Sequence, residues 1–176
     1  MLKKVDFYEW DKNDNIREST VMRRYHIQRR EDYVKLNKLC GSINHLGNEL
    51  GLLPEEDPVR QRLSALLYKR LHVLGLLLDE RPDRTPLSEL PGLVTVAALA
   101  RRRLAVIMVA RLKMSETLRE ATSFVEQGHV RIGPDTASDA GCLVTRAMED
   151  FVTWADGSKI KRKIAEYYDK VDDFEN

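Results

Sequence analysis

The chain has 176 residues, of which 29 are Lys or Arg and 28 are Asp or Glu, so its formal net charge is only +1. This length allows one domain of ordinary size or two small ones, and so balanced a charge points to no particular partner. The two cysteines, Cys40 and Cys142, exclude a disulfide framework and a Cys-rich zinc site, and the lack of a long apolar run excludes a membrane span, so we expect a soluble intracellular protein.

Residues 1–92 are predicted to form an N-terminal arm, a helical hairpin and a linker. Residues 1–20 are polar and aperiodic, which indicates an extended arm. Basic residues then surround Tyr25 and Tyr33, an arrangement that can bind an RNA backbone and stack on bases, or can begin an amphipathic helix whose tyrosines pack inward. The cations of this stretch are Arg23, Arg24, Arg29 and Arg30.

Leucine spacing predicts the two helices of the hairpin. An apolar stripe with spacings of three and four covers residues 33–50, and Gly51 is expected to end the first helix. In the second, Asp57 is the expected N-cap, Pro58 takes the first helical position and Gly75 follows the end. The expected buried positions are Tyr33, Leu36, Leu39, Ile43, Leu46 and Leu50 in the first helix and Leu63, Leu66, Leu67, Leu71 and Leu74 in the second.

A second unit is predicted over residues 93–155, after a proline-rich linker at residues 79–92. Its first helix is expected to be capped by Thr95 and to run to about Leu112. Three adjacent arginines, Arg101-Arg102-Arg103, then fall near the start of this helix, with the first two off its buried stripe. Such a run predicts an anion site, with a solvated helix face as the alternative.

The rest of this unit is predicted to be one more helix and a small antiparallel sheet. The helix begins near Ser115, has a capping-box pattern at Thr117 and Glu120, and stops at Gly128. The period then changes to two, which predicts a strand over residues 130–132, and two further strands are expected at residues 142–145 and 150–154. The fold class is therefore α+β, with two helices packed on a small sheet.

Basic residues concentrate in this unit and just after it. Residues 101–131 hold seven Lys or Arg and three Glu, whereas the segment from Glu166 to Asn176 is an acidic tail. Arg103 could brace the unit by pairing with a carboxylate, and His129 could simply close the turn before the strand. The extension over residues 156–176 starts with a basic run that either contacts RNA or forms a solvated helix face. The candidate RNA-binding residues of these regions are Arg101, Arg102, Arg103, Arg111, Lys113, Arg119, His129, Arg131, Lys159 and Lys161.

Five short motifs in fixed order resemble the RNA-binding module of small-subunit ribosomal protein S4. They are Arg102-Arg103-Leu104, Arg111-Leu112, Glu120-Ala121, Phe124-Val125 and Gly128-His129-Val130. The likeness to the module covers residues 98–154, and nearly the whole chain is similar to nucleolar members of this family that belong to the U3 small nucleolar ribonucleoprotein. The chain departs from the ribosomal module at Ala105, where an acidic residue is usual, and at Thr122, where a basic one is usual.

The resemblance implies a non-catalytic protein of the nucleus and nucleolus, without a cofactor, a metal or catalytic residues. It implies binding to U3 snoRNA and pre-rRNA within the small-subunit processome, where the protein promotes their pairing in early 18S rRNA processing and 40S assembly. It also implies a protein partner, a long scaffold named as an M-phase phosphoprotein. Two alternatives are a scaffold whose hairpin docks a partner peptide and a small-subunit ribosomal protein that binds mature rRNA.

Overall fold

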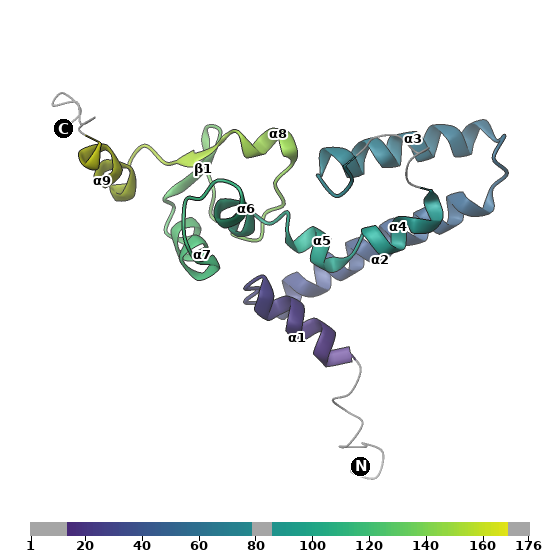
Figure 1. Ribbon diagram of the computed structural model, residues 1–176, viewed down its shortest axis with the longest axis horizontal. Coiled ribbons are helices and arrows are strands. Elements are labelled where there is room, and N and C mark those ends of the chain that lie inside the picture. The colour runs from purple at the N-terminus through teal and green to yellow at the C-terminus, as the bar shows by residue number, and fades with distance from the viewer. Residues whose placement is uncertain (1–13, 79–85, 169–176) are drawn as a thin grey trace, which may run out of the picture. The chain divides into compact units, whose positions relative to one another are not determined.

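The computed structural model describes residues 14–78 and 86–168 (Figure 1). The chain divides into two compact units. The N-terminal unit comprises Met1–His72 and Leu76–Arg101, and the C-terminal unit comprises Val73–Gly75 and Arg102–Asn176. In the described part of the first unit, all regular secondary structure is helical, and the second unit combines helices with a small antiparallel sheet. The predicted α+β class is therefore confirmed.

The N-terminal unit is built on one long helix. Its elements are α1 (Asp14–Arg24), α2 (Arg30–Leu52), α3 (Pro58–Val73), the 3-10 turn η2 (Leu87–Glu89), α4 (Leu90–Leu93) and α5 (Val96–Ala100). Helix α2 contacts α1, η2, α4 and α5. Because α1 begins at Asp14, residues 14–20 of the predicted arm are helical and not extended. Residues 1–13 of that arm lie outside the described residues.

Both long helices form, although α2 continues through Gly51 to Leu52 instead of ending at the glycine, and the structure buries different faces of them than predicted. Leu39 and Leu46 are 40% and 45% exposed, and Leu63 and Leu66 are 42% and 50% exposed, so these four expectations are wrong. The buried positions are Leu36, Cys40, Gly47 and Leu50 in α2 and Ser64, Leu67, Tyr68 and Leu71 in α3. Small residues in α2 allow close approach of its neighbours: a Cβ at Gly47 would lie 3.2 Å from Cδ1 of Leu90. Asp57 caps α3 as expected, since Val59 N donates to its Oδ1 at 2.8 Å.

Two segment predictions before the second unit need correction. Residues 87–93, expected to be linker, form η2 and α4, and Leu90 is fully buried; residues 79–85 lie outside the described residues. The single helix expected from Thr95 to Leu112 is two helices, α5 and α6 (Leu104–Ala110). Thr95 does cap the first, because its side chain accepts from Ala98 N.

The C-terminal unit packs α6 and α7 (Leu118–Glu126) together beside a three-stranded sheet (Figure 1). Its strands are β1 (Val130–Ile132), β2 (Asp135–Thr136) and β3 (Val152–Trp154), in the order β2-β1-β3, with both pairs antiparallel. The short helix α8 (Arg146–Glu149) precedes β3, and α9 (Lys159–Tyr167) follows it. The strand predicted at residues 142–145 is not a strand: its one ladder contact is a bridge from Leu143 to Arg103.

The core of this unit explains the two departures from the ribosomal pattern. Ala105 is 2% exposed within a cluster that includes Leu104, Ile107 and Val125. Thr122 is 4% exposed, and its Oγ1 donates to Leu118 O at 2.8 Å. A charged side chain at either buried position would need a buried partner, so small uncharged residues fit both sites.

Candidate nucleic-acid interface

The arginine triplet is split between the surface and the interior. Arg101 caps the end of α5 and is exposed, whereas Arg102 and Arg103 are only 5% and 4% exposed. The prediction that Arg102 lies off the buried stripe is therefore wrong. Long-range backbone hydrogen bonds cause this: Leu104 N donates to Cys142 O and Val144 N donates to Arg102 O, so the chain between α5 and α6 is drawn inward.

Arg102 is held by a network centred on Glu149. Its Nε and Nη2 donate to Val144 O at 3.1 and 2.7 Å, and Nη2 lies 2.5 Å from Glu149 Oε1, an ion pair without the alignment of a hydrogen bond. Arg111 Nη1 donates to the other carboxylate oxygen, Oε2, at 3.0 Å. This carboxylate faces one buried and one half-exposed guanidinium, since the Arg111 side chain is 59% exposed. Arg102 therefore positions α6 and α8, while Arg111 remains available to a ligand.

Three exposed cations lie where α6 leads into α7: two in the turn and one, Arg119, in the first turn of α7. Arg111, Lys113 and Arg119 are all exposed. Lys113 has a positive φ of 54°, a conformation that is strained for residues other than glycine and is enriched at functional sites. Thr117 and Glu120 then form the predicted capping box, which fixes where α7 begins. These cations therefore lie on a well-defined backbone.

A second polar cluster joins β1 to the start of α9. Asp156 accepts from Arg131 Nη1 and from Lys161 Nζ, both at 2.6 Å, and Arg131 Nε donates to Thr153 Oγ1 at 3.0 Å. The hydrogen bond from Lys161, together with the charge of Arg131, holds the pKa of the Asp156 carboxyl below its usual value. The structure thus brings together two of the predicted cations.

His129 and Lys159 lie at the same junction. His129 Nδ1 is 3.1 Å from Ser158 Oγ, and Ile160 N donates to that same oxygen, so the histidine contacts the N-cap of α9. Lys159 begins α9 and is exposed. The predicted role of His129 in a turn and its predicted RNA contact therefore remain compatible.

The predicted cations of the N-terminal unit lie around the turn from α1 to α2. Arg23, Arg24, Arg29 and Arg30 are all exposed. Arg24 lies over the buried Tyr25 ring, 5.7 Å from its centroid, and Arg30 Nε donates to Glu18 at 2.7 Å. Tyr25 is only 6% exposed, so its ring packs inward. This agrees with the alternative interpretation of the basic stretch, in which its tyrosines pack inward.

Sequence reasoning missed the two carboxylates that organise these clusters. Glu149 and Asp156 pair with basic residues distant along the chain, and no local spacing indicates such pairs. Among residues 14–78 and 86–168 there is no group of three or more potential metal ligands, and no helix there is long and apolar enough to cross a bilayer.

Comparison with known families agrees with this architecture. Residues 1–92 match the model of the ribosomal protein S4/S9 N-terminal domain, and residues 102–150 match the model of the S4 domain. The chain is 30% identical to small ribosomal subunit protein uS4 of Hyperthermus butylicus over 160 residues, which cover 90% of this chain and 86% of that protein. The fold and its basic turn thus define an S4-type RNA-binding protein.

Other relatives are more similar. The chain is 50% identical over 175 residues to U3 small nucleolar ribonucleoprotein protein IMP3 of Saccharomyces cerevisiae, covering 99% of this chain and 93% of that protein. It is 48% identical over 176 residues to the human protein of the same name, covering 99% and 92%. The chain belongs to the IMP3 family of U3 small nucleolar ribonucleoprotein proteins.

Proposed function

We propose that this protein is a non-catalytic RNA-binding component of the U3 small nucleolar ribonucleoprotein, acting in the nucleolus. There it binds U3 snoRNA and promotes pairing with pre-rRNA during early 18S rRNA processing and 40S assembly in the small-subunit processome. The observation that carries the proposal is an S4 domain that exposes Arg111 and Lys113 in the α6–α7 turn and Arg119 at the start of α7, in a chain similar to IMP3 proteins over 99% of its length.

The physical mechanism is charge neutralisation. Two RNA strands repel each other through their phosphates, and a surface that binds one strand with fixed cations lowers the cost of bringing the second strand close. Arg111 and Lys113 lie within three residues of each other on the turn, and Arg131 and Lys161 share Asp156 at the β1–α9 junction. Arg102 and Arg103 do not belong to this proposed surface, because their side chains are buried.

The salt dependence of RNA binding tests this proposal. About five phosphate contacts on single-stranded RNA give a log-log slope of about −3.5, at roughly −0.7 per contact. The triple change Arg111→Ala, Lys113→Ala and Arg119→Ala should flatten the slope by about 2. A matched triple change on the N-terminal unit, Lys38→Ala, Lys69→Ala and Arg70→Ala, should leave it nearly unchanged. An unchanged slope for the first variant, with its circular dichroism melt intact, would contradict the proposal.

A second candidate function is a scaffold that docks a partner peptide, such as a segment of the M-phase phosphoprotein. It is favoured by an exposed apolar stripe on α3, where Val59, Leu63 and Leu66 are 54%, 42% and 50% exposed. A pull-down in which Leu63→Ser with Leu66→Ser abolishes association, while the triple basic variant retains it, would favour the scaffold. Crosslinking in cells followed by sequencing of bound RNA separates U3 snoRNA from mature rRNA, the ligand of a ribosomal subunit protein.

A further inference from the structure

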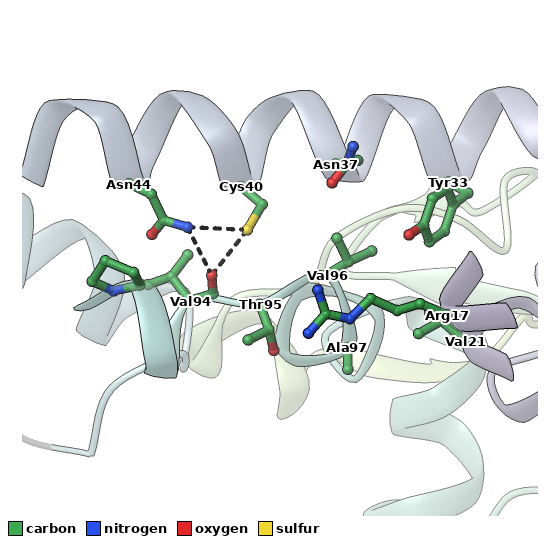
Figure 2. A pocket seen from close by; sticks show the side chains of 11 residues that line it. Arg17, Val21, Tyr33, Asn37, Cys40, Asn44, Val94, Thr95, Val96 and Ala97 are labelled. Carbon is green, nitrogen blue, oxygen red and sulfur yellow. Dashed lines mark hydrogen bonds between the residues drawn. The ribbon is translucent and has the colours of Figure 1, made fainter. Parts of the chain in front are cut away.

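A cavity of about 370 Å³ opens within the N-terminal unit, between α2 and the segment that leads into α5 (Figure 2). Arg17 and Val21 of α1 line one part of it, and the walls elsewhere come from α2, from Pro91 of α4 and from residues 94–97. Ligand pockets have volumes of roughly 300 to 1,000 Å³, so this one suits a single small group rather than a length of chain. The cations of the S4 domain described above do not line it.

One wall of the cavity is fixed by buried hydrogen bonds. Cys40 Sγ donates to Val94 O at 2.9 Å, and Asn44 Nδ2 donates to the same carbonyl at 3.3 Å, as the dashed lines in Figure 2 show. Within the described chain, Oδ1 of Asn44 is buried and accepts no hydrogen bond. An unpaired buried acceptor is costly, so this wall favours a ligand that carries an N–H or O–H donor.

The other polar groups of the cavity favour an anion with a flat ring. Figure 2 shows Arg17 and Tyr33 near one end, with Asn37 on α2 between Tyr33 and Cys40. Asn37 is exposed, and neither it nor Arg17 makes a hydrogen bond or ion pair with the described residues. The adjacent Glu18 pairs with Arg30 at 2.7 Å, and none of the described residues that line the cavity carries a carboxylate. A guanidinium without a carboxylate partner is suited to a phosphate.

We propose that this cavity binds one unpaired nucleotide of RNA, with the base beside Asn37 and Asn44 and the phosphate on Arg17. Proteins that recognise RNA by sequence hydrogen-bond to the edges of splayed bases, and the two carboxamides supply donors and acceptors for such an edge. Residues 16–44 contain seven Lys or Arg and three Asp or Glu, so the surroundings attract RNA. The inference rests on the proposed RNA binding but concerns a site that the S4 domain does not contain.

Nuclear magnetic resonance titration of the full chain tests it, with the four nucleoside 5′-monophosphates as probes. At least one should shift the side-chain amide signals of Asn37 and Asn44 saturably, and ribose 5-phosphate should not. Arg17→Ala should weaken the binding of that nucleotide by about fivefold, the order expected for an exposed ion pair. It should leave the binding of the matching nucleoside unaffected. Lys38→Ala, which removes an equal charge from α2 outside the cavity, should have a much smaller effect.

Three results would overturn the proposal. Equal shifts with ribose 5-phosphate would show a phosphate site only, saturable shifts with N-acetyltyrosine amide in place of nucleotides would show a peptide site, and no shift with any probe would show no site. Asn37→Leu provides a variant that keeps the fold, because the side chain is exposed, and it should lose the base-dependent shifts. These outcomes leave the salt slope of the S4 domain untouched, so failure here is distinguishable from failure of the proposed function.

Discussion

Arg102 and Glu149 form a buried ion pair, with 2.5 Å between Nη2 and Oε1 and side chains that are 6% and 11% exposed. The same guanidinium donates twice to Val144 O, so it joins the start of α6 to the segment before α8. A triplet that suggests an anion site by its sequence therefore contributes two of its members, Arg102 and Arg103, to the interior. Buried pairs of this kind are costly to break, because the remaining partner keeps a charge without a counter-ion.

We expect Glu149→Gln to lower the free energy of unfolding by about 3 kcal/mol or more, since it leaves Arg102 buried and unpaired. Arg111→Ala, which removes the half-exposed partner of the same carboxylate, should cost about 1 kcal/mol or less. Urea denaturation of both variants measures the difference. Equal losses would show that the two arginines contribute alike and that burial of Arg102 is unimportant.

Two of the three glycines of α2, Gly41 and Gly47, should respond oppositely to alanine. A methyl group added at Gly41 would meet nothing within 4 Å, so Gly41→Ala should stabilise the protein by about 0.5 to 1 kcal/mol through helix propensity. At Gly47 the new Cβ would lie 3.2 Å from Cδ1 of the fully buried Leu90. Gly47→Ala should lose that gain or become destabilising. Thermal melts of the two variants test this difference. Equal stabilisation would show that α4 can move away from the methyl group added at position 47.

Removing the carboxylate that Arg131 and Lys161 share should strengthen RNA binding. Asp156→Asn frees both cations, and we expect about a twofold to fivefold rise in affinity at low salt that disappears as salt increases. The control Asp150→Asn removes an equal charge from an exposed position of the same unit. Filter binding over a salt series measures both variants. A rise of the same size in the control would assign the effect to net charge alone.

The pH dependence of the Asp156 contacts follows from its lowered pKa, caused first by the Lys161 hydrogen bond. Their contribution to stability is present above the unfolded-state value of about 3.9 and is lost as pH falls through the lower folded value. The difference in RNA affinity between Asp156→Asn and the unchanged protein should therefore stay constant from about pH 5.5 to 8. A difference that fades at the acidic end of this range would contradict the lowered pKa.

Cys40 should react slowly with iodoacetamide. Burial raises the pKa of its thiol, and burial with the charge of Asp139 raises the pKa of Cys142, so both hold less thiolate at pH 8 than unfolded cysteine does. Cys40 is 8% exposed and its thiol donates a hydrogen bond to Val94 O, so Cys40 should react more slowly than Cys142. Mass spectrometry of a labelling time course, with and without urea, compares them. Labelling of Cys40 as fast in the folded protein as in urea would contradict its burial.

The sequence alone determined the class of fold and several helix ends. Caps and glycines are local signals, so Asp57, Thr95, Thr117 and Gly128 marked helix ends that the structure confirms. Alternation after Gly128 likewise marked β1, because a strand with one buried face shows a period of two. The motifs from Arg102 to Val130 also sufficed for the family, which depends on order and spacing rather than on contacts.

Only the tertiary structure decided which side chains face inward. Leu39 and Leu46 satisfy helical periodicity yet are exposed, because the neighbours of α2 pack on its small residues, Cys40 and Gly47 among them. Leu63 and Leu66 are exposed on α3, which buries Ser64, Leu67, Tyr68 and Leu71 instead. Arg102 is buried and Arg101 is exposed because of contacts that are distant in sequence. Cys142, Val144 and Glu149 lie far along the chain, and their hydrogen bonds and charge reach Arg102 and its neighbours only after the chain has folded.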